Sequence, residues 1–394
     1  MPANRLNTFE QVATVLATML QQVTGQAQLT ATNTAQFVDQ ASTLLQADYE
    51  PIMNAMSVVM NRTLFVDRPY TRKFLSLYAD SQRYGNHTRK ISYLDQPFVE
   101  NDEFKLVDGQ SIDQWIVRKP KVVQFNFYGS STDSDYVTIY TNQIDTALTG
   151  PDEFARFLAG VMTAIRNKHS QAEETFARFV IANAIAAKCY ADSGNIIHLV
   201  TEYNAYTGES LTAATVRDPD NVGNFVRWLA GRLKTLIEFM GERSIKYHMN
   251  PTAGNITRFT PRDMMRVFLN TGEMNQIATR VFTDAFHDDE LRTVSYESVN
   301  YWQSITDGEH MLVSAMPSYI DADGVEQKAQ AAVTPGVDIL GIIFDRDFTG
   351  YTRINQNMRP TPINARGSYS NMWWHWTFRY WQDLSENCVV LALD

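Results

Sequence analysis

Residues 150–194 read GPDEFARFLAGVMTAIRNKHSQAEETFARFVIANAIAAKCYADSG, and this stretch decides the fold. Pro151, Asp152 and Glu153 predict a helix start, because proline suits the first turn and acidic side chains stabilise the positive end of the helix dipole. Apolar residues then recur at helical spacing to about Tyr190. One helix of this extent would be about 60 Å long, at about 1.5 Å per residue, whereas a typical helix has about 11–12 residues. Such a rod suits an extended, flat subunit better than a compact enzyme.

Upstream of this stretch, residues 1–63 are predicted to form an N-terminal helical arm. Thr8 and Gln11 make a capping box, and apolar residues follow at helical spacing. The first sixty residues contain only five charged side chains, Arg5, Glu10, Asp39, Asp48 and Glu50. An arm with so little core of its own is expected to pack on the body of the same chain or on a neighbouring copy.

Residues 64–150 change to strands and loops. Val123, Phe125 and Phe127 alternate with polar residues, which is typical of a half-buried strand. An acidic segment precedes them, FVENDEFKLVDGQSIDQW at 98–115, with Asp108-Gly109 as a turn. Its acidic residues include Glu100, Asp102, Glu103 and Asp108, and the flanking basic residues include Arg68, Arg72, Lys73, Arg89 and Arg118. This pattern fits an acidic tip that docks on basic residues of an adjoining subunit, and it fits equally a solvated loop with scattered counter-charges.

Downstream of the long helix, residues 195–336 mix helices and strands. Apolar spacing predicts a helix over 225–240 and a second helix that starts at Thr260-Pro261 and carries Met264 to Leu269. Strands are predicted at 337–344, at 373–381 and at 388–393. The rings of Trp374, Trp376 and Phe378 alternate with polar residues, so they fit sheet core better than a stacking platform for single-stranded nucleic acid.

Composition excludes several classes of protein. The chain has 394 residues, with 34 basic and 44 acidic side chains, so the formal charge is 34 − 44 = −10. An excess of acidic over basic side chains argues against a protein whose main task is to bind nucleic acid. Two cysteines, Cys189 and Cys388, cannot form a disulfide framework or a four-sulfur zinc site. Nowhere do 18 consecutive apolar residues occur, which argues against a transmembrane helix.

The sequence contains no catalytic signature. There is no GxGxxG, Walker loop, GxSxG, HExxH or CxxC motif. The densest group of metal-ligand types is His287, Asp288, Asp289 and Glu290, whose adjacent side chains point in different directions, so a solvated helix end is the better interpretation. Asp321 to Gly324 looks like a plain β-turn because it lacks the later ligands of a calcium loop. His169 and His198 have no identifiable partner, and no catalytic residue, metal or cofactor is expected.

The order of the elements resembles the capsid fold of tailed phages, the HK-97 type. It is most similar to the major capsid proteins of phi-29-like podophages. The likeness lies in QFNFYGSSTDSDYVTIYTNQIDTALTGPDEFARFLAGVMTAIRN (124–167), in IIFDRDFTGYTRINQNMRPTPINARGSYSNMWWHWTFRYWQ (342–382), in the apolar ending ENCVVLALD and in the acidic, cysteine-poor composition.

The resemblance implies an α+β fold with five regions. These are the N-terminal helical arm (1–63), the peripheral-domain strands with an extended loop at about 81–122 (64–150), the spine helix of the peripheral domain (151–194), the axial domain (195–336) and C-terminal strands that complete the peripheral domain (337–394). The extended loop is expected to lie across a neighbouring subunit.

The resemblance also implies a function and partners. The expected function is that of a major capsid protein, which self-assembles into pentamers and hexamers of an icosahedral shell around the double-stranded DNA of a tailed bacteriophage. Because the N-terminal arm is short and nearly uncharged, unlike the long charged propeptide of the family's self-scaffolding members, a separate scaffolding protein is expected. The resemblance also implies a portal, non-specific contacts to the packaged DNA and assembly in the host cytoplasm. The sequence stops at Asp394 after the last predicted strand, so decoration is expected from other chains. The alternatives are an encapsulin-like nanocompartment shell and a metal-dependent hydrolase that uses His287, Asp288 and Glu290.

Overall fold

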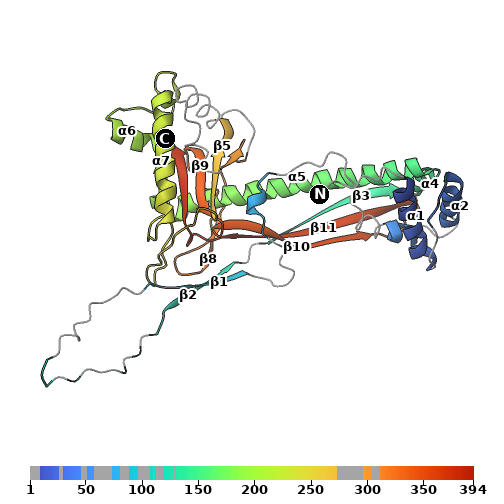
Figure 1. The fold of residues 1–394 in the computed structure, drawn as a ribbon, viewed down its shortest axis with the longest axis horizontal. Coiled ribbons are helices and arrows are strands. Elements are labelled where there is room, and N and C mark those ends of the chain that lie inside the picture. The colour runs from blue at the N-terminus through green and yellow to red at the C-terminus, as the bar shows by residue number, and fades with distance from the viewer. Residues whose placement is uncertain are drawn as a thin grey trace.

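The helix α5 (Pro151–Ala191) forms the long axis of the molecule, and two sheets lie along it (Figure 1). The computed structural model describes residues 9–25, 30–45, 51–56, 73–79, 88–95, 107–109, 111, 115, 117, 119–127, 130–272, 296–303 and 311–394. A two-stranded hairpin projects from one end of this body, and a group of short helices lies at the other end.

The long helix is confirmed as one element of 41 residues. Pro151 occupies the first turn, with Asp152 and Glu153 beside it, and Lys188 lies in the last turn. In the first half of α5 only the residues on one side of the helix are buried, whereas all nine residues from Val180 to Lys188 are buried. The fully buried ammonium of Lys188 lies 2.5 Å from a carboxylate oxygen of Asp192, which compensates its charge.

A three-stranded antiparallel sheet runs beside the first half of α5, in the order β10 (Thr349–Pro360), β11 (Tyr369–Gln382) and β3 (Ser130–Tyr140). Alternate residues of β11, among them Trp374, Trp376 and Phe378, are buried, and Phe176 of α5 stacks on Phe378 at 5.1 Å. The prediction that these rings form sheet core is therefore confirmed.

A five-stranded sheet covers the second half of α5. Its order is β4 (Ile196–His198), β12 (Cys388–Leu393), β9 (Asp338–Asp345), β5 (Met265–Asn270) and β6 (Glu297–Val299). One face packs on α5, and the other packs on α6 (Leu199–Thr207) and α7 (Val222–Gly241). Because both faces are covered, β9 and β12 are almost continuously apolar.

The N-terminal helices lie against the far end of α5 (Figure 1). They are α1 (Phe9–Thr24), α2 (Thr34–Leu45) and a helical segment at 51–56, and α4 (Thr141–Ala147) leads into α5. The rings of Phe9, Phe37 and Phe154 form a chain with centroid distances of 6.3 and 6.4 Å. The arm was expected to pack either on the body of the same chain or on a neighbouring copy, and in the structure it packs on the body of the same chain.

Two small hairpins complete the described elements. The strands β1 (Thr88–Tyr93) and β2 (Val122–Phe127) pair antiparallel, as do β7 (Ser318–Ile320) and β8 (Glu326–Lys328). Short 3-10 turns occur at Leu75–Leu77, Ser193–Asn195 and Thr215–Arg217. Within the described part of the chain, no helix combines the length and the hydropathy needed to cross a membrane.

The structure differs from one expectation. The helix predicted from Thr260 is wrong, because Met265–Asn270 forms the strand β5 between β9 and β6. A run of apolar residues lacks a decisive period, and pairing with the two neighbouring strands determines its conformation. The strands of residues 337–394 divide between the two sheets, because β10 and β11 enter the three-stranded sheet and β9 and β12 enter the five-stranded sheet.

The chain crosses between the two sheets twice, at adjacent points. Residues 346–348 lead from β9 to β10, and residues 383–387 lead from β11 to β12. The amide of Asp345 donates to the carbonyl of Asn387 at 2.9 Å, and the amide of Asp383 donates to the carbonyl of Phe348 at 2.7 Å. These bonds hold the crossings together.

Candidate assembly surfaces

The projecting hairpin, here called the stem (β1 and β2), has two different faces. Register pairs Lys90 with Phe125 and Ser92 with Val123, so these side chains share one face, and Phe125, Phe127 and Ser92 are buried. The other face carries Ile91, Tyr93 and Val122. Strict alternation of this kind follows from the two-residue period of a strand.

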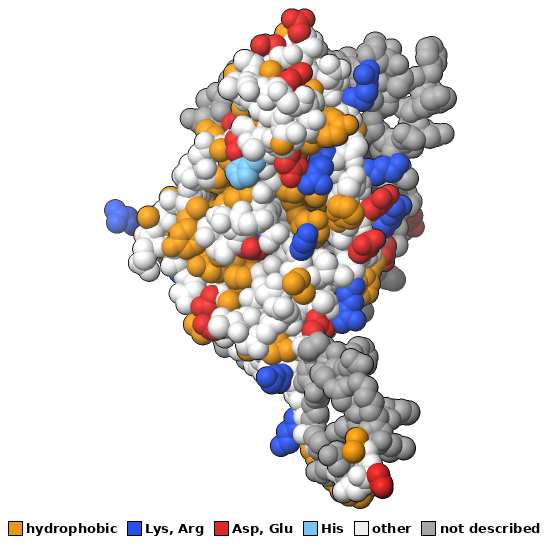
Figure 2. Space-filling model, turned by 90° about the vertical axis from the view of Figure 1, so that its left-hand side faces the viewer, with side chains coloured by type: hydrophobic (Ala, Val, Ile, Leu, Met, Phe, Trp, Pro, Cys, Tyr) orange, Lys and Arg blue, Asp and Glu red, His pale blue; other side chains and the backbone are white. Residues whose placement is uncertain are grey.

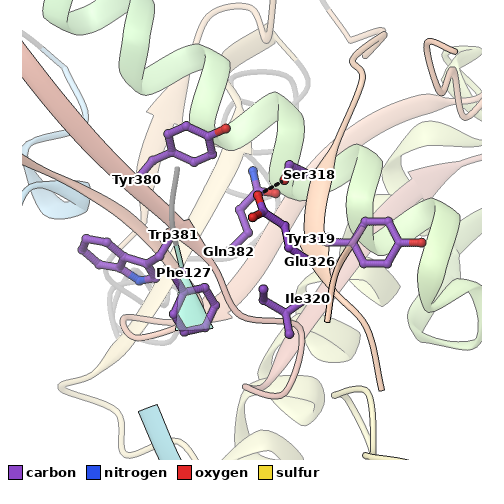
Figure 3. Close-up of a pocket in the computed structure, with 8 residues that line it drawn as sticks. All are labelled: Phe127, Ser318, Tyr319, Ile320, Glu326, Tyr380, Trp381 and Gln382. Carbon is purple, nitrogen blue, oxygen red and sulfur yellow. Dashed lines mark hydrogen bonds between the residues drawn. The ribbon is translucent and has the colours of Figure 1, made fainter. Parts of the chain in front are cut away.

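The buried face of the stem packs on the body. Phe125 and Phe127 form an apolar cluster with Ile320 of β7, against which Trp381 of β11 packs. Figure 3 shows a small hollow at this junction, with Phe127, Ile320 and Trp381 around it and the Ser318 hydroxyl hydrogen-bonded to Glu326. Gly324 lies at the turn of the β7–β8 hairpin with a φ of +79°, and a Cβ there would meet the Gln124 carbonyl at 3.0 Å. The turn can therefore lie close against β2.

A charge cluster of Lys90, Arg258, Asp383 and Glu386 fixes the stem at its base. The Lys90 ammonium contacts the carboxylates of Asp383 and Glu386. Arg258 donates to the Ser92 hydroxyl at 2.8 Å and to the Ser385 carbonyl at 3.1 Å, and it lies 3.5 Å from Glu386. Burial raises the pKa of Glu386, while the charges of Lys90 and Arg258 oppose that rise.

A second attachment lies where the chain leaves β1. The guanidinium of Arg243 lies 3.0 Å from a carboxylate oxygen of Asp95, and the Thr257 amide donates to the same carboxylate. Burial tends to raise the pKa of Asp95, but the hydrogen bonds from Thr257 and the charge of Arg243 outweigh it and lower the pKa below its usual value. The stem is thus attached through an apolar cluster, a charge cluster and this pair.

The outward face of the stem is uncovered by any described residue. Ile91 is 52% exposed, Tyr93 66% and Val122 54%, and we call these three residues the stem stripe. Val107 and Val117, farther along the loop, are also exposed. Figure 2 shows hydrophobic, basic and acidic side chains on the part of the projection that is described. Apolar side chains grouped on a projection are typical of a surface that contacts another molecule.

The structure describes only three of the predicted contact residues. Asp108 is exposed in the turn 107–109, Arg89 is exposed on the outward face of β1, and the amide of Lys73 donates to Glu174 of α5 at 3.4 Å. The other predicted contact residues lie outside the described residues, and they are Glu100, Asp102, Glu103, Arg68, Arg72 and Arg118. The described residues alone therefore bring no predicted acidic residue together with a predicted basic one.

The candidate metal residues His287, Asp288 and Glu290 also lie outside the described part of the chain. Within that part, no three His, Cys, Asp or Glu side chains are placed to hold a metal ion. Asp321 forms a plain turn, as predicted, with its carboxylate accepting from the amides of Asp323 and Val325.

Sequence reasoning missed several side-chain contacts. It treated His169 and His198 as partnerless, but His198 contacts the Asp394 carboxylate and His169 packs on Trp376 at 4.6 Å. It also missed the charge cluster. Lys90 lies in a strand whose side chains alternate between two faces, and the paired strand β2 is mostly apolar. The alternation on β1 could have placed Lys90 on the buried face, but its acidic partners are 293 and 296 residues away.

The sequence of the chain matches a known protein family. Residues 12–392 match the family described as Phi29-like phage major capsid protein. The chain belongs to that family. It is a phage major capsid protein, a structural component of the virion, and its fold is the α+β, HK-97-type capsid fold. No curated protein sequence matches it.

Solved structures agree in fold. A chain in the capsid structure of Staphylococcus phage Andhra is 13% identical, with a TM-score of 0.53, and the match covers 84% of this chain and 87% of that one. A chain in the structure of the head fibre and inner core protein of native bacteriophage P68 is 11% identical, with the same TM-score and the same coverage. Neither an encapsulin-like compartment nor a hydrolase gains support from these comparisons.

Proposed function

We propose that this capsid protein associates with further copies through its extended loop and stem, and that the copies form pentamers and hexamers of an icosahedral shell. The observation that carries this proposal is the two-faced stem. One face is fixed to the body by Phe125, Phe127 and the charge cluster, so the outward stripe is held in a constant position. A fixed projection with an uncovered apolar face is suited to a contact that repeats identically in every copy.

The acidic tip adds a second part to the proposed contact. Glu100, Asp102, Glu103 and Asp108 would approach basic residues of the adjoining copy, with Arg68, Arg72, Lys73, Arg89 and Arg118 as candidates. The exposed positions of Asp108 and Arg89 are compatible with this role. Exposed ion pairs contribute only about 0–1 kcal/mol each. The tip would therefore determine register, while apolar contacts provide most of the affinity.

The shell is proposed to enclose the double-stranded DNA of a tailed bacteriophage and to assemble in the host cytoplasm with a separate scaffolding protein and a portal. The formal charge of −10 supports a container whose DNA contacts are sparse and independent of sequence. A strongly basic lining would immobilise the packaged genome.

The test is electron microscopy of particles that form from wild type and from a variant carrying Asp102→Lys with Glu103→Lys. Wild type is expected to give closed shells, and the reversed tip is expected to remain as folded, unassembled subunits. The matched control is Asp218→Lys with Asp220→Lys, which reverses two exposed acidic residues before α7 and should still give shells. Normal shells from the tip variant would overturn the ionic part of the contact. A wild-type chain that stays monomeric with its scaffold present would overturn the assembly proposal.

A further inference from the structure

His248 is a buried imidazole in the segment between α7 and β5. It is 3% exposed, and both of its ring nitrogens lie against oxygen atoms. Nε2 lies 2.7 Å from the carbonyl oxygen of Ile256, and Nδ1 lies 2.9 Å from the carbonyl oxygen of Lys246 and 3.2 Å from Oδ1 of Asn387. A neutral imidazole donates from one nitrogen only, and the shortest contact assigns that hydrogen to Nε2. The neutral ring therefore binds the carbonyl of Ile256.

This carbonyl lies inside the second attachment of the stem. Asn255 and Thr257 flank Ile256 in the sequence, and both contact Asp95, where the chain leaves β1. The Asp95 amide donates to the Asn255 carbonyl at 3.0 Å, and the Thr257 amide donates to the Asp95 carboxylate. The ring of His248 thus supports, from the interior, the backbone that holds the stem.

The residue before His248 has a strained backbone. Tyr247 has a φ of +68°, in the left-handed region that a bulky side chain rarely adopts. Three hydrogen bonds hold it there. Its amide donates to Oδ1 of Asn195 at 3.1 Å, and its carbonyl accepts from the Cys388 amide at 2.7 Å and from the Lys188 ammonium at 3.2 Å. Because contacts maintain this strain, the segment relaxes once they are lost, which suits it to two conformations.

The charges on the elements around the ring give little support to a second proton. From α5, the ammonium of Lys188 is fully buried beside Asp192, and its positive charge opposes an imidazolium. From β9, the carboxylate of Asp345 is separated from the ring by Asn387 and Thr260, which form a hydrogen-bonded chain with distances of 3.2, 3.2 and 2.8 Å. Burial raises the pKa of Asp345, so this carboxylate compensates a cation on the ring poorly.

The crossing at 383–387 and burial act in the same direction. On the crossing, the carboxylate of Glu386 is already paired with Lys90 and Arg258. Burial lowers the pKa of His248 and the charge of Lys188 lowers it further, whereas the hydrogen bonds to the three oxygens oppose the decrease. Because burial prevails, the pKa lies below its ordinary 6.5, and the closed segment favours the neutral ring.

We propose that His248 is an acid-sensitive joint, which holds the stem at Asp95 while the ring is neutral and releases it when the ring takes up a second proton. That proton comes from water and binds Nδ1, and the cation leaves the buried site for solvent together with the segment 246–257. Because the pKa of the ring is lower in the closed segment than in solvent, the closed state loses stability as the pH falls below about 6.5. The joint goes beyond the proposed function, since it belongs to the single subunit and is independent of what the stem contacts.

The first test is amide hydrogen exchange of the full-length, unassembled subunit at about pH 7.5 and about pH 5, with rates corrected for intrinsic exchange. Protection of the amides of Asp95 and Thr257 is expected to fall about threefold or more at the lower pH. The amides of Ala315 and Val333, which donate to each other's carbonyls elsewhere in the body, should keep their protection. Equal or greater protection of Asp95 and Thr257 at the lower pH would overturn the joint.

The second test removes the titrating ring. His248→Gln is expected to give the same protection of Asp95 and Thr257 at both pH values, because glutamine takes up no proton. His198→Gln, the control, removes a histidine of β4 whose side chain is 47% exposed, and it should respond to pH like the wild type. The comparison separates His248 from Glu386, whose pKa is raised by burial and which titrates in the same range. A His248→Gln subunit that keeps the wild-type response would contradict the proposal.

A third measurement uses the wild type alone and decides the question even where His248→Gln does not fold. Nuclear magnetic resonance of the His248 Cε1 proton should show a titration midpoint below 6.5, and the protection of Asp95 should fall over the same pH range. A midpoint at or above 6.5, or a midpoint with no loss of protection at Asp95, would overturn the joint. None of these readouts involves shells, so the proposed function stands or falls separately, by microscopy of the assembled wild type.

Discussion

The two sheets of this protein differ in how many of their faces are covered. The five-stranded sheet lies between α5 on one side and α6 and α7 on the other, and every residue of β12 is buried. The three-stranded sheet is covered by α5 on one face, whereas its other face is covered by the stem only at the end near Trp381 and carries the partly exposed rings of Tyr136 and Tyr140 at the far end. The first sheet is thus the stable core of the subunit, and the second has a face that remains available to other molecules. Substitutions in the two sheets should separate folding from assembly.

The largest effect is expected in the doubly covered sheet. Leu391→Ala in β12 removes a side chain that is fully buried in the cluster shared with α7. It should lower the free energy of unfolding of the unassembled subunit by about 2–5 kcal/mol, measured by urea denaturation. Val325→Ala, at a position 55% exposed beside the β7–β8 turn, is the control and should change little. Equal losses for both variants would mean that burial does not distinguish these positions.

A smaller effect is expected where the stem meets the link between the two sheets. Lys90→Met leaves the carboxylates of Asp383 and Glu386 without their nearest ammonium. The free energy of unfolding should fall by about 1–3 kcal/mol. Arg89→Met, one residue earlier on the exposed face of β1, is the matched control, with an expected change below about 0.5 kcal/mol. If the two variants were equally stable, the charge cluster would not be holding the stem.

The same cluster predicts a pH dependence. Burial raises the pKa of Glu386 above its ordinary 4.5. A carboxyl with a raised pKa in the folded state contributes stability that is fully present below the unfolded pKa and is lost as the pH rises through the folded pKa. Glu386→Gln should therefore reduce the decline in the free energy of unfolding as the pH is raised above 4.5. The measurement is a series of urea titrations, with exposed Glu242→Gln as the control. Parallel profiles for wild type and Glu386→Gln would contradict the prediction.

The smallest effect on stability is expected on the open face of the three-stranded sheet. Tyr136→Ala removes a ring that is half exposed and stacks on Trp373. The unassembled subunit should lose about 1 kcal/mol or less, again measured by urea denaturation. A loss as large as that of Leu391→Ala would show that the Tyr136–Trp373 pair is part of the core of the subunit.

Local sequence patterns predicted the elements that depend on local chemistry. The proline and acidic residues after Gly150 predicted the start of α5, and alternating rings predicted the buried face of β11. The strand β5 was mistaken for a helix, because the residues from Met264 to Leu269 are apolar apart from Arg266 and show no decisive period, and pairing with β9 and β6 decides their conformation. The division of residues 337–394 between two sheets depends on such distant pairings and leaves no local signal.

The assembly surfaces were predictable only in outline. The acidic loop and its basic flanks are visible in the sequence, but the faces on which side chains lie depend on strand register. Register separates Lys90, which is directed to the body, from Ile91 and Tyr93, which are directed outward. In the same way, register places Trp373 and Tyr136 together although 237 residues separate them along the chain (373 − 136 = 237).

The five-stranded sheet also affects biosynthesis. Its members come from residues 196–198, 265–270, 297–299, 338–345 and 388–393, and β12 occupies an interior position between β4 and β9. On the ribosome, therefore, the second half of α5 is synthesised long before the strands that cover it, and the sheet cannot close until residues 388–393 have left the exit tunnel. A nascent chain is then unable to offer a finished body to its neighbours, and subunits become competent for shell building only after translation of that last strand.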